Sequence, residues 1–407
     1  MRLRNISGQA SRAMLVLALG ACAASKSPMN RADVEEGQAY QAEYRSITHD
    51  RSAMIGGSYQ INRDKCFSDP NLIVAPKSRA TDTLFNGDGL SPGDLVEIDV
   101  AGDDLFDGSF QIDQQGYLRP PFLEPIKASG RAPAELQAIM AANLLKERFF
   151  RGKPPRVSIR LRDYGVSQVH VAGAVWSAGA FDLNFKTTEI RDNLRQDSLG
   201  DATNGRGVVN AIASAGGARP DADLANVQIR RNGELYSVDL RNAARGRAYE
   251  NLMMAPGDEV FVPSRSCFQK ELAKPTPITR PGIKVFMSNL TIPADSNSES
   301  AIGISARELR YGTTFIQAVA GMNCYGGTQL TNADRYAVLF SRDPITGESV
   351  VIQRRIEELL RNANRDEFNP IMLPDDALAC YDSWATNVRD VATTLGILLA
   401  PAIVNQL

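Results

Sequence analysis

The feature that most constrains this chain is a block of sequence that occurs twice in its second half. The first copy closes with a Pro-Gly-Asp turn at 256–258 and an apolar strand, and the second closes with Pro-Asp-Asp at 374–376. The copies are offset by roughly 110–120 residues, far more than a solenoid period. The pattern therefore predicts two copies of one small α+β domain, an arrangement typical of scaffolds and rings. In each copy the parts are an apolar strand with a turn (169–181 and 283–294), an apolar helix ending in a glycine pair (208–217 and 313–327), an alternating strand (227–230 and 336–341) and the closing segment (252–263 and 370–379).

A further domain precedes the repeats. A Pro-Gly-Asp turn at 92–94 leads into an alternating strand at 95–100. A second strand at 109–113, a helix at 133–149 that begins with proline, and a strand at 157–161 follow. We therefore expect an α+β fold. The predicted segments are a signal peptide (1–21), a tether (22–87), this first domain (88–165), the first repeat (166–264), a linker (265–281), the second repeat (282–379) and a terminal amphipathic membrane helix (380–407).

The N-terminus has the composition of a bacterial export signal. Three arginines accompany a short apolar run at 13–19, which is too short to span a bilayer. The run leads into Leu-Gly-Ala before Cys22, which resembles the lipobox at which a cysteine is acylated. We expect Cys22 to carry lipid, and Ala23 after it favours the outer membrane. An ordinary cleaved signal with a chance cysteine is the alternative.

The end of the chain, from 384 to 407, has the pattern of one amphipathic helix. At 1.5 Å per residue it is roughly 36 Å long, enough to cross a hydrocarbon core. One such helix with a polar stripe is a poor membrane span, whereas a ring of copies can turn the polar stripes inward. The alternative is a helix docked on the protein's own core. The predicted lipid-facing residues are Trp384, Val388, Val391, Leu395 and Leu398, and the predicted pore-lining residues are Arg389, Asp390, Thr393 and Thr394.

Composition excludes several classes of function. The 407 residues carry a net charge of −2, which leaves no basic footprint for nucleic acid. The chain has only two histidines, His49 and His170, and no paired cysteine motif. We therefore expect no metal, no cofactor and no catalytic triad, and we do not expect an enzyme.

The cysteines indicate disulfides. Without Cys22, four remain, and an even number in an oxidising compartment predicts bridges with three possible pairings. Cys324 and Cys380 both belong to the second repeat or its edge, so we favour that pair, which leaves Cys66 with Cys267.

Other motifs have simpler interpretations than binding or catalysis. The glycine pairs at 216–217 and 326–327 follow helices rather than open them, so they predict helix C-caps rather than phosphate cradles. We expect an aspartate-rich stretch (94–107) to cap turns, and Tyr164, Trp176 and Phe181 to pack in cores or subunit contacts rather than against sugars. His170 is predicted to be a strand residue.

Two sets of motifs resemble known domains. The turn at 90–94 with Ile-Asp-Gln-Gln-Gly-Tyr-Leu-Arg-Pro at 112–120 is similar to the polysaccharide export sequence domain. Gly-Ala-Val-Trp-Ser-Ala-Gly at 173–179, the glycine pair at 216–217 and the turn at 255–258 resemble the soluble-ligand-binding β-grasp (SLBB) domain. Together with the lipobox and terminal helix, this order resembles the outer-membrane polysaccharide export lipoproteins. The chain departs from that pattern at Ala178, where proline is common, and in the second repeat at 288–294 and 374–376.

The resemblance implies a function and partners. It implies two β-grasp domains stacked on a periplasmic ring of export domains, in a homo-octamer whose terminal helices form a pore. The implied cargo is a capsular or extracellular polysaccharide. The implied partners are outer-membrane lipid and an inner-membrane polysaccharide co-polymerase, with most of the chain in the periplasm. Two alternatives remain: a periplasmic glycan-binding lipoprotein that forms no pore, and a glycan-modifying enzyme.

Overall fold

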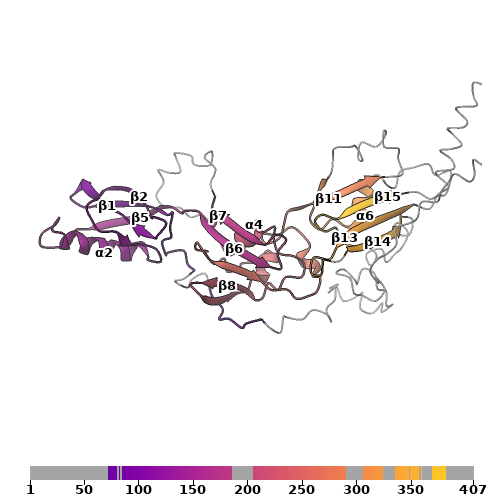
Figure 1. Ribbon diagram of the computed structural model, residues 1–407, viewed down its shortest axis with the longest axis horizontal. Coiled ribbons are helices and arrows are strands. Elements are labelled where there is room, and N and C mark those ends of the chain that lie inside the picture. The colour runs from indigo at the N-terminus through magenta and orange to yellow at the C-terminus, as the bar shows by residue number, and fades with distance from the viewer. Residues whose placement is uncertain are drawn as a thin grey trace, which may run out of the picture. The chain divides into compact units, whose positions relative to one another are not determined.

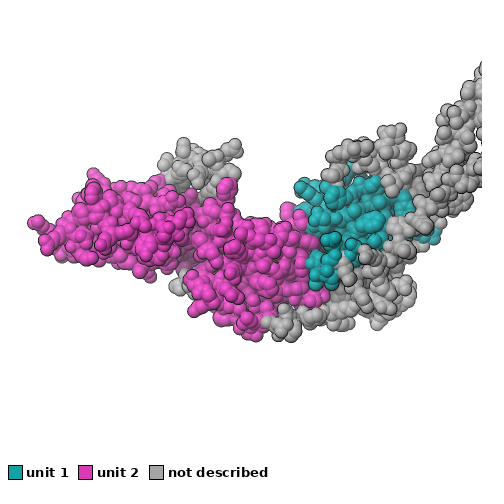
Figure 2. Space-filling view, viewed as in Figure 1, with its two compact units in different colours: residues 1–59, 282–407 teal, residues 60–281 magenta. Residues whose placement is uncertain are grey.

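The computed structural model describes residues 72–79, 82, 85–185, 205–289, 306–322, 324, 335–347, 349–356, 359 and 369–381. The chain divides into two compact units, one of residues 60–281 and one of residues 1–59 with 282–407 (Figure 2). The secondary structure is mixed α+β, with several sheets and few helices (Figure 1). None of the described helices is long and apolar enough to cross a membrane. The terminal helix predicted at 380–407 lies outside the described residues, except that Cys380 and Tyr381 close a strand.

The first domain packs one helix on a small antiparallel sheet of order β2-β1-β5. Alternate residues of β1 are buried, as its pattern predicts. Leu136, Met140 and Leu144 lie four residues apart on one face of α2, and each is 0% exposed. The elements are β1 (Leu95–Val100), η4 (Asp104–Phe106), β2 (Gly108–Gln111), β3 (Tyr117–Leu118), β4 (Ile126–Lys127), α2 (Pro133–Lys146) and β5 (Val157–Asp163).

Helix α2 begins at the predicted proline but ends at Lys146, before the predicted 149. The N–H of Phe149 donates to the carbonyl of Leu144 at 3.1 Å, and the N–H of Arg148 donates to that of Leu145 at 3.2 Å. These two bonds form a Schellman motif, with Arg148 in the left-handed region at φ 64°. The apolar pattern continues beyond this cap, which is why it predicted a longer helix.

The first repeat is a five-stranded sheet of order β7-β6-β10-β8-β9 with helix α4. Its central pair, β6 and β10, is parallel, and the other pairs are antiparallel. Val208, Ala211 and Ile212 of α4 are buried in the same core as Val169 and Val260 of the central pair. The elements are β6 (Ser167–Gly173), β7 (Gly179–Leu183), α4 (Val208–Ser214), β8 (Val227–Arg231), β9 (Glu234–Val238), α5 (Arg241–Ala244) and β10 (Glu259–Val262).

The second repeat has the same topology. Its sheet has the order β12-β11-β15-β13-β14, again with a parallel pair, β11 and β15, at the equivalent place. The duplication inferred from the sequence is therefore present in the strand order. The elements are β11 (Gly282–Asn289), β12 (Arg307–Arg310), α6 (Phe315–Gly321), β13 (Tyr336–Arg342), β14 (Ser349–Arg355) and β15 (Ala377–Tyr381).

The helices of the two repeats end with the same kind of backbone bond. After α4, the N–H of Gly217 donates to the carbonyl of Ile212 and that of Gly216 to Ala213, a Schellman motif with φ 78° at Gly216. This is the predicted C-cap. Helix α6 ends at Gly321, earlier than the predicted 327, where the N–H of Cys324 donates to the carbonyl of Val319 at 3.2 Å. The second glycine pair lies outside the described residues.

The segments on either side of the first repeat are part of its fold. Residues 265–281, expected to be a linker, contribute Ile278 to the repeat's core, and Cys267 and Phe268 are also buried. Within the expected tether, Lys77 forms a parallel bridge with Ser237, so residues near it extend the sheet at the edge strand β9. Both segments are polar or proline-rich in sequence, which concealed their packing.

Candidate functional site

Most of the residues predicted from the sequence to be functional lie outside the described residues. This holds for the lipidation candidate, one cysteine and the whole terminal set: Cys22, Cys66, Trp384, Val388, Arg389, Asp390, Val391, Thr393, Thr394, Leu395 and Leu398. Their predicted roles stay predictions. The other three cysteines are described, as are the aromatic, histidine and aspartate residues of the sequence analysis.

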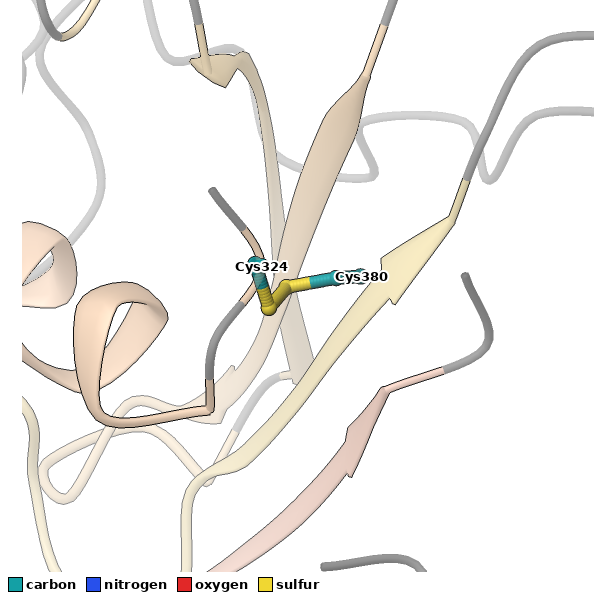
Figure 3. The surroundings of a disulfide bond; sticks show 2 residues. All are labelled: Cys324 and Cys380. Carbon is teal, nitrogen blue, oxygen red and sulfur yellow. A yellow bond between two sulfur atoms is a disulfide. The ribbon is translucent and has the colours of Figure 1, made fainter. Parts of the chain in front are cut away.

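A disulfide joins Cys324 to Cys380, the pairing favoured from the sequence (Figure 3). The two Cα atoms are 6.2 Å apart, and both side chains are 0% exposed. The bridge links the segment after α6 to the last described strand, β15. Cys267 is also disulfide-bonded and buried. Cys66, its expected partner, lies outside the described residues.

One turn recurs at the start of three strands. It consists of Ser-Pro-Gly-Asp at 91–94 before β1, Ala-Pro-Gly-Asp at 255–258 before β10, and Leu-Pro-Asp-Asp at 373–376 before β15. In each, the aspartate side chain accepts the N–H of the turn's first residue, at 2.7, 2.8 and 2.7 Å. The third residue is left-handed each time, with φ values of 87°, 88° and 65°. The aspartates are 0%, 2% and 1% exposed. Each aspartate thus fixes its turn from inside the fold.

Asp94 also joins the first domain to the first repeat. Its carboxylate accepts a hydrogen bond from Arg206 Nη1 at 3.0 Å and from the N–H of Gly165 at 2.8 Å. Arg206 donates in addition to Ser91 Oγ at 2.8 Å and to the carbonyl of Met254 at 3.2 Å. We call these five residues the Asp94 junction. It lies within one compact unit and connects backbone and side chains of both domains.

The electrostatics of the junction are those of a buried ion pair. Arg206 is 3% exposed, and its guanidinium lies 5.3 Å from the centre of the Tyr164 ring. Burial raises the pKa of the Asp94 carboxyl above its ordinary value, while Arg206 and the N–H donors of Gly165 and Ser91 act in the opposite direction. The cost of removing both charges from water offsets much of the attraction in such a pair.

Two backbone segments, at Gly165 and at Gly93–Asp94, pass very close to each other at this junction. A Cβ on Gly165 would lie 2.4 Å from the carbonyl carbon of Gly93 and 2.9 Å from the backbone nitrogen of Asp94. Backbone atoms cannot move aside as a flexible side chain can. Only glycine fits at position 165.

Asp258 also forms an ion pair with an arginine, Arg231. Arg231 donates from Nε to Asp258 at 2.9 Å and from Nη2 at 2.5 Å, and it also donates to the carbonyl of Met253 at 2.7 Å. Its guanidinium lies 4.4 Å from the centre of the Phe85 ring. The turn before β10 is thereby tied to β8 and to the segment that precedes the first domain.

A cavity of about 230 Å³ lies beside both arginines. Its lining includes Ser91, Tyr164, Arg206, Arg231 and Met253. Because each arginine has a carboxylate partner, the lining carries no excess charge from them. Among the described residues, no group of three histidine, cysteine or acidic side chains is placed to hold a metal ion. The arrangement is suited to holding two domains in a fixed orientation.

The aromatic and acidic residues considered in the sequence analysis make contacts within the fold. The hydroxyl of Tyr164 donates to the carbonyl of Gly87 at 3.3 Å, and Phe181 is partly buried against the core of the first repeat. His170 is an exposed residue of strand β6. In the aspartate-rich stretch, Asp103 accepts the N–H of Leu105, which caps η4.

Sequence reasoning missed Arg206 and Arg231. An arginine between two glycines at 205–207 carries no periodic signal, and Arg231 ends a strand as many exposed residues do. The recurrence of the Pro-x-Asp turn at three strand starts was a signal that could have directed a search for their partners.

Two family models match the chain. The model described as polysaccharide biosynthesis/export protein matches residues 87–162. The model described as SLBB domain matches residues 202–262. A search of curated proteins found no match. The first match coincides with the first domain, and the second contains α4, β8, β9 and β10 of the first repeat.

Proposed function

We propose that this chain belongs to the polysaccharide export protein family and has a transport function. In this proposal it is a component that carries capsular or extracellular polysaccharide across the outer membrane as a homo-oligomeric ring. The domains that match are transport and binding domains, not enzymes. A hydrated passage needs no chemical step, because its task is to keep a hydrophilic glycan away from hydrocarbon.

The observation that carries the proposal is the order and junction of the two matched domains. The export domain is followed directly by the SLBB domain, and the buried pair of Asp94 and Arg206 joins them. Identical copies can form a closed ring when each presents the same surfaces at the same angle. A junction in which Gly165 admits no side chain supports such a fixed angle.

The repeats support the proposed β-grasp folds. In both, the strand order is second, first, fifth, third, fourth, and a helix follows the second strand. The first and fifth strands are parallel in both. The second repeat therefore extends the proposal to a second β-grasp domain beyond the part that a family model matches.

The disulfides support the proposed location. Buried disulfides persist in oxidising compartments and are rare in the cytosol. The bridge between Cys324 and Cys380 and the bonded Cys267 accord with a mostly periplasmic chain. We place its lipid anchor at Cys22 and its partner, a polysaccharide co-polymerase, in the inner membrane.

The test is export by a chain that lacks the proposed membrane helix. A strain that carries only a chain ending at Ser383 should lose surface polysaccharide and retain glycan in the periplasm, while the full-length chain restores the surface layer. Unchanged surface polysaccharide in the truncated strain would exclude the pore and favour a glycan-binding lipoprotein.

A matched pair of arginine variants tests the two predicted faces of that helix. Leu395→Arg places a charge toward lipid and should abolish insertion, since a charge near the bilayer centre costs about 3 kcal/mol or more. Thr393→Arg places it toward water and should permit insertion while altering export. Membrane fractionation and surface polysaccharide are the readouts, and identical behaviour of both variants would contradict the assignment of faces.

A further inference from the structure

The loop between α2 and β5 is strongly basic. Residues 146–156, the last residue of α2 and the loop after it, which we call the basic loop, contain five cations and one carboxylate, a net charge of +4 in a chain whose total is −2. The positive charge is therefore a local feature of the export domain. The charged residues are Lys146, Glu147, Arg148, Arg151, Lys153 and Arg156.

Most of these cations have no partner within the described part of the chain. Lys146 lies 3.8 Å from Glu147, and this is the one ion pair of the loop among the described residues. Arg148, Arg151 and Lys153, with Arg156, are exposed. Their charge is thus available to a ligand.

The neighbouring loop at 101–107 carries three aspartates, but none of them forms an ion pair with these cations among the described residues. The N–H of Ala101 donates to the carbonyl of Arg156 at 2.9 Å, which places the two loops side by side. The carboxylates of Asp103 and Asp107 accept the backbone N–H groups of Leu105 and Val100, at 2.8 and 2.7 Å. No ion pair among the described residues links the two loops.

Arg148 occupies a position that favours glycine. It is the left-handed residue of the Schellman motif that ends α2, the place that Gly216 takes after α4. A side chain there is strained, because Cβ crowds the backbone in the left-handed region. Arginine at a glycine position is therefore tolerated at a cost in stability, which makes the role of its side chain a question for experiment.

The next residue in the sequence, Phe149, is aromatic. Phe149 is 39% exposed, and its ring packs edge-on against buried Phe106 at a centroid distance of 5.1 Å. The ring is thus held in place while part of its surface remains open. Cations beside a fixed aromatic ring suit a ligand that combines negative charge with apolar C–H surface.

We propose that the basic loop binds an acidic polysaccharide, one that carries carboxylates along its sugar chain. The inference rests on the proposed export function and names the class of glycan that the export domain meets. Repeating carboxylates match the spaced cations, and a sugar ring can lie against Phe149. The loop lies within the domain that the polysaccharide biosynthesis/export model matches, which favours a glycan over an anionic lipid surface as its ligand.

The experiment measures binding by the full-length, detergent-extracted protein. The probes are polygalacturonate, dextran of the same length and vesicles of phosphatidylglycerol. The protein should bind polygalacturonate more tightly than dextran, and the affinity should fall as salt is raised. Arg148→Gly should weaken polygalacturonate binding about threefold, and Arg151→Gln with Lys153→Gln about tenfold.

The controls separate binding from folding. Arg148→Gly should melt at the same temperature as the wild type or higher, since glycine relieves the left-handed strain. Arg247→Gln removes an exposed cation elsewhere in the same unit and should leave binding unchanged. Equal binding of dextran, no binding of polygalacturonate, or loop variants that bind like the wild type would overturn the proposal. Loop-dependent binding of vesicles alone would assign the loop to lipid instead.

Failure of this inference can be told apart from failure of the proposed function. If loop variants bind normally but the chain truncated after Ser383 still abolishes surface polysaccharide, only the binding site is wrong. If that truncation leaves export unchanged, the transport function itself fails.

Discussion

At the scale of single residues, the recurring Pro-x-Asp turn explains why one strand in each domain (β1, β10 and β15) begins in the same way. Gly257 and Asp375 occupy the same left-handed position, at φ 88° and 65°. The loss of glycine at position 375, visible as a departure in the sequence, therefore did not change the turn. Aspartate tolerates this conformation better than most residues but less well than glycine.

The variants Gly257→Asp and Asp375→Gly should change the free energy of unfolding in opposite directions. A Cβ at position 257 would meet nothing within 4 Å, so only backbone strain opposes Gly257→Asp. We expect Gly257→Asp to lower the free energy of unfolding by about 1 kcal/mol and Asp375→Gly to raise it by up to about 1 kcal/mol. Urea unfolding followed by circular dichroism provides the measurement. A destabilised Asp375→Gly would show that the aspartate does more than occupy the turn.

Removing the arginine of the Asp94 junction should lower the free energy of unfolding far more than removing the arginine of a surface ion pair. Arg206→Met leaves a carboxylate that is 0% exposed without its cation, which should cost about 3–5 kcal/mol. Arg230→Met is the matched control, because Arg230 and Glu259 are 3.6 Å apart and 55% and 60% exposed. That change should stay within about 1 kcal/mol. Similar unfolding midpoints for the two variants would refute the assignment of Arg206 as the anchor of the junction.

At the scale of elements, the disulfide fixes the end of the second repeat. Cys324 and Cys380 enclose a sequence separation of 56 residues. Replacing both with alanine should destabilise this repeat by about 4 kcal/mol on a chain-entropy estimate. The double variant leaves Cys267 untouched, so guanidinium unfolding of oxidised wild type and variant isolates this bridge. An unchanged midpoint would mean that the repeat is held by its core alone.

Local patterns predicted the regular elements well and their ends less well. Alternation located β1, and a proline located the start of α2. The end of α2 was placed too late, because Phe149 and Phe150 continue the apolar pattern beyond the cap. The end of α6 was also placed too late, because the chain leaves the helix after Gly321 and the N–H of Cys324 bonds back to the carbonyl of Val319.

At the scale of the whole molecule, repetition was the strongest signal. The order of parts in the two copies predicted a duplicated α+β domain, and the sheets share one strand order. What could not be predicted were contacts between distant segments, such as Arg206 with Asp94 or Lys77 with Ser237. Neither pair leaves a trace in local periodicity. The candidate site therefore emerged from the structure, although its turn was visible in the sequence.

The measurement that tests the central claim most directly is the mass of the full-length protein extracted from membranes in detergent. Native mass spectrometry should find a closed multiple of the lipidated chain, with eight copies expected from the family resemblance. Dissociation should then release a single species acylated at Cys22. A lipidated monomer under conditions that preserve membrane complexes would contradict the ring and, with it, the proposed route for polysaccharide through the outer membrane.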